Sequence, residues 1–172
     1  MSTVNIIVGL QAENTIKIAP YGGAEEDAKS LGLVKGGISI EHEQTQQEIM
    51  VDQYLGPVEQ ITTAESLNIK TTLAEGTLGN LAAAMGKEYT EGEDLDLGAV
   101  STNAYHTLYI NVKGQDNKKR TYTFWKCKIN GKTTQAYKRD GETVADIEFN
   151  VLIDPAKPAA RRFGFVTETE AV

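Results

Sequence analysis

The sequence predicts a mainly β fold, a β-sandwich or partly closed barrel of two packed antiparallel sheets flanked by one short α-helix at about residues 77–85. Three observations support this expectation. Several segments alternate apolar and polar residues with a period of two, turn-forming residues separate them, and only one segment has helical periodicity. The length of 172 residues suits one domain spanning residues 1–172, and no internal repeat or linker divides it.

The predicted strands follow from the alternation. The clearest is Ser66–Leu73, in which every second side chain from Leu67 onwards is expected on one face. Ile38–Glu43 and Glu48–Asp52 alternate in the same way, so the polar link Gln44–Gln47 between them is predicted to be a hairpin tip. The remaining strand candidates are residues 4–10, 15–18, 105–113, 120–129, 132–139 and 143–153.

Turn signals separate these strands. Asn130-Gly131 and Asp140-Gly141 predict hairpins in the C-terminal half, because both dipeptides accept the positive φ of tight turns. Pro20–Ser30 is predicted to be an exposed loop with room for one helical turn, and Lys87–Gly98 to be an acidic loop. The last residues, 167–172, are expected to form a flexible tail.

The one helix is expected between Thr77, whose hydroxyl can cap the first turn, and Gly86, which suits the left-handed position after the last turn. A helix of this length is marginal alone in water, so it must pack against the sheet. The apolar stripe expected to make that contact has the spacing i, i+3, i+4 and i+7: Leu78, Leu81, Ala82 and Met85.

Composition narrows the function classes. The net charge of −7 argues against binding nucleic acid by neutralising phosphates, and it suits either a solvated surface or a passage to which DNA must not adhere. No apolar run reaches the roughly 20 residues of a membrane helix, so no membrane partner is expected. The N-terminus does not resemble a signal peptide. Cys127 is the single cysteine, which suits a reducing cytoplasm.

No catalytic arrangement is visible, so the sequence predicts no enzyme, no cofactor and no metal. Cys127 lies between two lysines on a strand, where adjacent side chains point to opposite faces, which favours a structural thiol. The same alternation turns His42 away from Glu41 and Glu43, so the three cannot converge on one metal ion.

Two further motifs have ordinary structural explanations. Gly36-Gly37 lacks the glycine spacing of a phosphate loop and is interpreted as a bulge or bend at the start of a strand. Phe124-Trp125 beside Lys126 and Lys128 has the composition of a nucleic-acid surface, but a core or interface tryptophan is favoured in an acidic chain.

The block from Gly36 to Gly86 resembles the phage tail tube proteins, the major tail proteins of long-tailed bacteriophages. The order of its motifs carries the resemblance, and together they cover about half of the chain. The matching segments are Gly36-Gly37, Glu48–Gln53, Pro57-Val58, Leu73–Glu75 and Thr77–Gly86, with a looser match over Phe149–Pro155.

This resemblance implies a structural virion protein that polymerises as stacked hexameric rings into a hollow tail tube, a helical assembly that conducts DNA during ejection. It implies the virion tail as location, with assembly in the host cytoplasm. The implied partners are further copies of the chain, the tape measure, tail terminator and distal tail or baseplate proteins, and in contractile tails a sheath. DNA passes through the lumen without specific binding.

Two sets of residues become candidates on this interpretation. The candidates for lining the lumen are Ser39, Glu41, Glu43, Glu48 and Asp52. The candidates for contacts between rings are Tyr21, Glu25, Glu26, Asp27, Gln44, Gln46, Gln47, Glu91, Glu93 and Asp94. The sequence leaves two alternatives open: the inner tube of a contractile injection or secretion system, and a carbohydrate-binding β-sandwich.

Overall fold

A computed structural model describes residues 15–98, 104–113, 118–130, 134–136 and 144–170. Its described residues form a mainly β fold with one short α-helix, which confirms the predicted class. The strand expected at residues 4–10 lies outside the described residues. In the described part of the chain, no helix has the length and apolar character required to cross a membrane.

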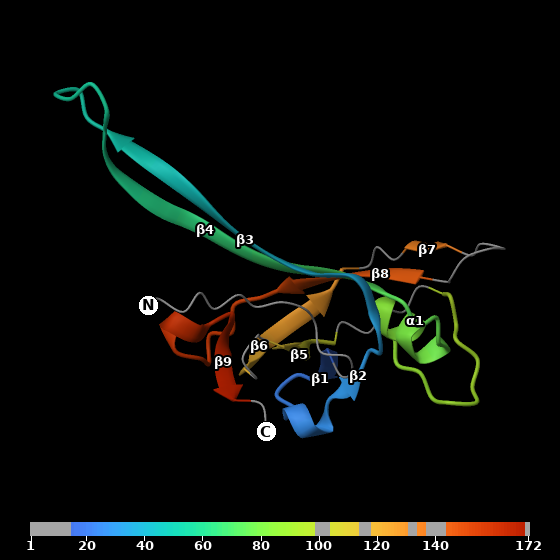
Figure 1. The fold of residues 1–172 in the computed structure, drawn as a ribbon. Helices are drawn as coiled ribbons and strands as arrows, with labels where there is room; N and C mark the ends of the chain where they lie inside the picture. The colour runs from blue at the N-terminus through green and yellow to red at the C-terminus, as the bar shows by residue number, and fades with distance from the viewer. Residues whose placement is uncertain (1–14, 99–103, 114–117, 131–133, 137–143, 171–172) are drawn as a thin grey trace.

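In chain order the elements are β1 (Ile16–Pro20), the 3-10 turn η1 (Glu25–Asp27), β2 (Lys29–Ser30), β3 (Val34–Met50), β4 (Pro57–Leu73), α1 (Leu78–Ala84), β5 (His106–Lys113), β6 (Lys118–Ile129), β7 (Thr134–Ala136), β8 (Val144–Val151), the 3-10 turn η2 (Ala159–Arg161) and β9 (Gly164–Glu170) (Figure 1).

The strands pair in the order β2-β1-β5-β6-β8-β4-β3, and every described pairing is antiparallel. One edge of β6 pairs with β5, and the other has two successive partners: Lys118–Phe124 pairs with β9, and Cys127–Ile129 pairs with β8. β7 pairs with β8. The sheet is therefore branched and not closed, in keeping with a sandwich-like arrangement.

The core lies where β1, β4, β5, β6 and β8 face one another. Alternation along the strands turns one face of each toward this core, and β8 alternates buried and less buried side chains along its length. Ile69, Leu73 and Phe149 are fully excluded from solvent. The other members of the buried cluster are Ile16, Leu31, Ala84, Leu108, Ile110, Phe124, Cys127, Ile147 and Val151.

The largest departure from the predicted fold is a long two-stranded arm. β3 and β4 have 17 residues each and extend together far beyond the body (Figure 1). The prediction of a hairpin tip at Gln44–Gln47 is wrong, because these residues lie within β3 and the chain turns between Met50 and Pro57. Gln44–Gln47 contains none of the residues that favour tight turns, whereas the actual turn contains Asp52 and Gly56.

The arm begins at a bulge. Gly36 and Gly37 have φ angles of 75° and 88°, which favour glycine, and the pairing skips from Lys35 to Ile38 across them. The expectation of a bulge at this position is confirmed. Because a bulge bends a strand and increases its twist, it redirects β3 at the point where the arm leaves the body.

Helix α1 forms where it was predicted, but its packing differs. The Thr77 hydroxyl accepts a hydrogen bond from the Asn80 amide at 3.2 Å, which confirms the cap. The prediction that Leu78 packs against the sheet is wrong, since 49% of Leu78 is exposed. Ala82 and Ala84 are the buried apolar residues, and Leu81 and Met85 are only partly covered. Small alanine side chains allow the helix to approach β8 closely. Leu78, the first residue of the predicted apolar stripe, lies outside this contact.

The expectation of a flexible tail over residues 167–172 is also wrong for Thr167–Glu170. These residues form the end of β9 and pair with β6, with Lys118 opposite Glu170. Glu168 accepts a hydrogen bond from the Arg120 side chain at 2.7 Å and lies 3.3 Å from the Lys118 ammonium. The opposite charges on β6 and β9 stabilise this pairing. The polar sequence of Thr167–Glu170 taken alone did not indicate a strand.

Candidate functional site

The arm has backbone edges that the described chain does not pair. Within these residues β3 pairs with β4 alone, so its other edge is open from Ile38 to Met50. β4 pairs with β8 only over Leu67–Leu73, so its second edge is open from Pro57 to Ser66. Unpaired strand edges present rows of N–H and C=O groups that can pair with another chain.

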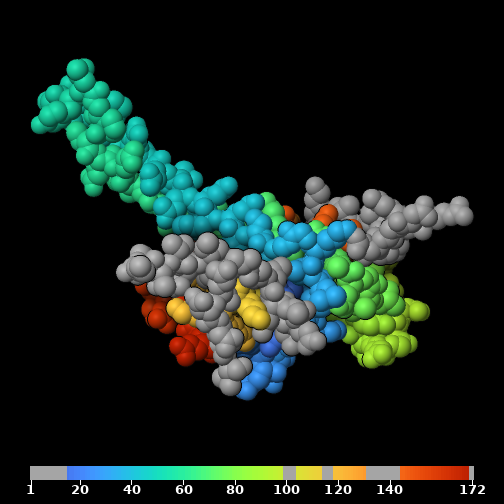
Figure 2. All heavy atoms as spheres, in the orientation of Figure 1, coloured from blue at the N-terminus to red at the C-terminus, as the bar shows by residue number. Residues whose placement is uncertain are grey.

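The arm is also distinctive in its side chains. Between Ser39 and Ile69 the sequence has six acidic residues and no lysine or arginine. At the tip, Met50 is 63% exposed, Tyr54 is 68% exposed and Leu55 is fully exposed. Figure 2 shows the outer half of the arm standing clear of the body, where its own chain does not cover it. An exposed apolar tip of this kind indicates a contact surface.

The candidate lumen residues all lie on the arm, but they do not share one face. Because β3 is continuous, alternation puts Ser39, Glu41 and Glu43 on one face and Glu48 on the other. Asp52 lies in the turn at the tip. The structure therefore divides these candidates between the two faces of β3 and the tip of the arm.

Among the acidic residues of the arm, Glu41 forms an ion pair with a described residue, whereas Glu48 and Glu65 accept hydrogen bonds from glutamine side chains. The Glu41 carboxylate lies 2.8 Å from the Lys70 ammonium, and this hydrogen bond, together with the charge of Glu41, raises the pKa of Lys70. Both side chains are more than 40% exposed, so the pair contributes little to stability. Its effect is local, since it removes the net charge at the root of the arm.

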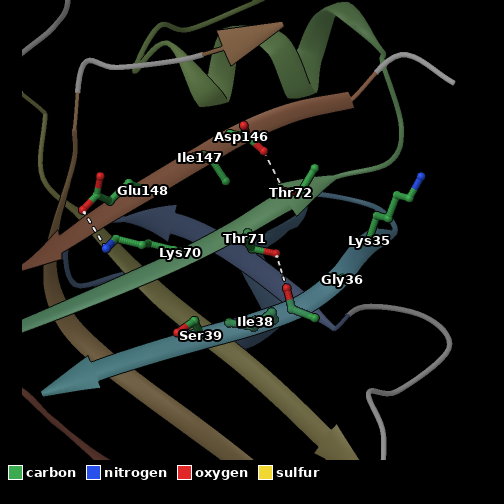
Figure 3. Close-up of a pocket in the computed structure, with 11 residues that line it drawn as sticks. Lys35, Gly36, Ile38, Ser39, Lys70, Thr71, Thr72, Asp146, Ile147 and Glu148 are labelled. Atoms are coloured by element: carbon green, nitrogen blue, oxygen red, sulfur yellow. Dashed lines mark hydrogen bonds and ion pairs between the residues drawn. The ribbon is translucent and has the colours of Figure 1, made fainter. Parts of the chain in front are cut away.

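A hollow of about 520 Å³ lies beside the bulge, between β3, β4 and β8 (Figure 3). Its polar groups are engaged with one another: Thr72 donates to Asp146 at 2.7 Å, and Thr71 donates to the Gly37 carbonyl at 3.1 Å. Lys35 points away from the hollow in Figure 3. The lining combines paired polar groups with Ile38 and Ile147, and it presents no nucleophile with a neighbouring base.

The candidates for contacts between rings fall in three separate places. Gln44, Gln46 and Gln47 lie on the arm, where the Gln44 amide donates to Glu65 at 2.6 Å. Tyr21, Glu25, Glu26 and Asp27 lie at η1, and Glu91, Glu93 and Asp94 in the loop after α1. In Figure 1 the η1 segment and the loop after α1 lie on the body, far from the arm tip. These candidates therefore lie at both ends of the molecule.

Two of these candidates make contacts within the chain. The Tyr21 hydroxyl donates to Asp154 at 2.9 Å, and Glu25 lies 3.5 Å from the Lys17 ammonium. Asp154 is buried, which opposes its ionisation, but the hydrogen bonds from Tyr21 and the Ala156 amide outweigh this effect and lower its pKa. Tyr21 and Asp154 thus join the turn after β1 to the segment after β8. The sequence pattern gave no sign of this pair.

Cys127 occupies the core, with no exposed surface, and burial raises the pKa of its thiol to about 12. We therefore expect the native chain not to react with a disulfide reagent at pH 8, because the thiolate is the reactive form. The same chain in denaturant should release one equivalent of chromophore rapidly. Rapid stoichiometric reaction of the folded chain would show that the thiol is accessible and ionised.

Among the described residues, no three histidine, cysteine, aspartate or glutamate side chains are arranged to bind one metal ion. The described features that set this chain apart are the open edges, the acidic arm and its apolar tip. The chain matches none of the protein-family models and none of the curated proteins against which it was compared.

Proposed function

We propose that the chain is a structural subunit that polymerises through its arm into rings, and that these rings stack into the hollow tail tube of a bacteriophage. The observation that carries the proposal is the pair of open edges on an arm whose outer part, Gln44–Ser66, contributes nothing to the core. Between Gln44 and Ser66 no residue is buried, so folding of the single chain does not account for this segment. A partner outside the chain that hydrogen-bonds to the open edges would account for it.

Identical copies are the partners that the geometry favours. An open edge on every subunit can pair with the edge of the next, and closing the ring leaves no edge exposed. Such contacts are heterologous, since one surface of a copy meets a different surface of its neighbour, and heterologous contacts generate rings or helical filaments. Both architectures are needed in a tube of stacked rings.

The charge of the arm supports a role as conduit. The acidic residues on its inward face, repeated in every copy around a narrow channel, would produce a negative field focused by the protein walls. A polyanion such as DNA would be repelled from all sides and could slide without adhering. On this proposal the acidic face that lines the channel is either the Glu41–Glu43 face or the Glu48 face of β3, because one face of the strand must turn outward.

Electron microscopy of the purified protein at high concentration tests the proposal. We expect hexameric rings or tubes, either spontaneously or after addition of the isolated tail-tip complex that initiates the tube. The matched control is the same chain at a concentration below the assembly threshold, where it should be monomeric. A chain that stays monomeric at every concentration and with the initiating complex would contradict the proposed function.

A further inference from the structure

A cluster of aromatic and cationic side chains lies on the body where β6, η2 and β9 meet. The Trp125 and Phe165 rings are 5.1 Å apart. The Lys157 ammonium lies 4.1 Å from the centre of the Trp125 ring, and the Arg161 guanidinium 5.4 Å from the centre of the Phe165 ring. The Trp125 indole N–H donates to the Arg161 carbonyl at 3.0 Å, which joins η2 to β6. We call these four residues together with Arg162 the cationic patch.

The two arginines of this patch are not neutralised by the described residues, and Lys157 is attracted to Asp154, whose pKa it helps to lower. Lys157, Arg161 and Arg162 make no ion pair with any residue that the structure describes. The acid nearest in sequence, Asp154, is buried and already accepts hydrogen bonds from Tyr21 and Ala156. Both arginines are exposed. Arginine and tryptophan together are the residues most enriched at the energetic centres of protein interfaces.

The chain itself supplies a complementary surface. The arm has six acidic residues and no basic ones between Ser39 and Ile69, whereas residues 104–172 have twelve basic and eight acidic residues. Glu48 pairs with Gln60 and Glu59 with Ile49, so the two carboxylates project from opposite faces of the outer arm, and neither makes an ion pair with a described residue. The two charge surfaces therefore lie on different parts of one molecule.

The arm cannot meet the patch of its own chain without losing pairing. β4 is held to β8 over Leu67–Leu73, and the β3–β4 ladder continues from there to the tip. In Figure 1 the outer arm stands clear of β6 and β9. We propose that the cationic patch of one copy binds the outer arm of a second copy, which is acidic on both faces through Glu48 and Glu59. This inference rests on the proposed function and specifies where the arm docks.

The patch also has the composition of a nucleic-acid surface, with aromatic rings beside cations. A second copy is the better occupant because the complementary acidic surface is present on every chain. The net charge of −7 disfavours phosphate binding over the molecule as a whole. Electrostatic docking also predicts that assembly weakens with added salt, because exposed charges are screened over about 8 Å at physiological ionic strength.

Trp125 is the only tryptophan of the chain, so its fluorescence reports this patch alone. We expect the wild-type chain to show a shifted emission and reduced quenching by iodide once it assembles. R161E/R162E should raise the critical concentration for assembly at least tenfold, and E48K/E59K should do the same from the other side. The matched control is K29E/K113E, which has the same charge change as the patch variant at exposed lysines of β2 and β5 and should assemble as wild type does.

Mixing the two reversed variants provides the decisive experiment. R161E/R162E and E48K/E59K should co-assemble in equal amounts, because each then offers the charge that the other lacks. The arm variant changes only exposed residues, so it remains informative if the patch variant fails to fold. Normal assembly of both variants with unchanged tryptophan emission would overturn this inference and leave the proposed function standing.

Two other results also decide against the docking. Loss of binding to a labelled DNA duplex in R161E/R162E, with assembly intact, would assign the patch to nucleic acid. A wild-type chain that never assembles would overturn this inference and the proposed function together.

Discussion

A chain whose arm is shortened to Gln44 and Glu65 and closed by an Asn-Gly turn should fold as the full chain does but should not assemble. These two residues face each other across the arm, so a type I′ turn can join them without changing the register. No residue removed between them is buried. We therefore expect the midpoint of thermal unfolding to stay within a few degrees of wild type.

Circular dichroism and light scattering measure the two halves of this prediction separately. The shortened chain should have a wild-type unfolding transition and the mass of a monomer at concentrations where the full chain forms rings. As a control, the single variant Leu55→Ser removes the most exposed apolar residue of the tip but keeps both strand edges. Tubes formed by the shortened chain would show that the arm is dispensable for assembly.

Phe149→Ala should destabilise the body more than any change in the arm. Phe149 is fully buried at the centre of β8, opposite Ile69 on one side and Ile129 on the other. Removing a buried phenylalanine ring costs about 3–5 kcal/mol, because burial is lost and a cavity remains. Since the whole stability of a domain is about 5–15 kcal/mol, the variant should be close to unfolded at 37 °C.

Urea unfolding followed by tryptophan fluorescence measures this cost through the shift in midpoint. The matched control is Ile153→Ala, two residues beyond the end of β8, where 47% of the side chain is exposed. Its free energy of unfolding should change by no more than about 0.5 kcal/mol if it behaves as a surface site. Equal losses in the two variants would contradict the position of Phe149 at the centre of the core.

Patterns of neighbouring residues in the sequence correctly predicted two kinds of element. These are the helix, whose cap lies within its own segment, and the strands that have one clearly buried face. The Thr77 cap and the alternation ending at Leu73 are read from adjacent residues, and both are confirmed. The arm escaped prediction because neither of its faces is buried, so alternation across Gln44–Gln47 had no reason to continue. β9 escaped for a related reason, since its exposed, charged residues depend on β6 for their pairing.

The candidate site was predictable in part. The acidic residues of the arm were identified from their strand pattern, but the faces on which they lie depend on where the chain turns. The apolar tip was concealed because Tyr54 and Leu55 have the composition of core residues. The cationic patch combines residues from β6, η2 and β9, and such proximity depends on tertiary structure that spacing along the chain does not contain.

Amide hydrogen exchange of the arm, compared between monomer and assembly, tests the central claim most directly. In the monomer the outward amides of Ile38–Met50 and Val58–Ser66 should exchange rapidly, since no described strand accepts their hydrogen bonds. Assembly should slow exchange along at least one of these edges, as expected for a new ladder between copies. Assembled protein whose arm exchanges as fast as in the monomer, with protection confined to the body, would contradict the account.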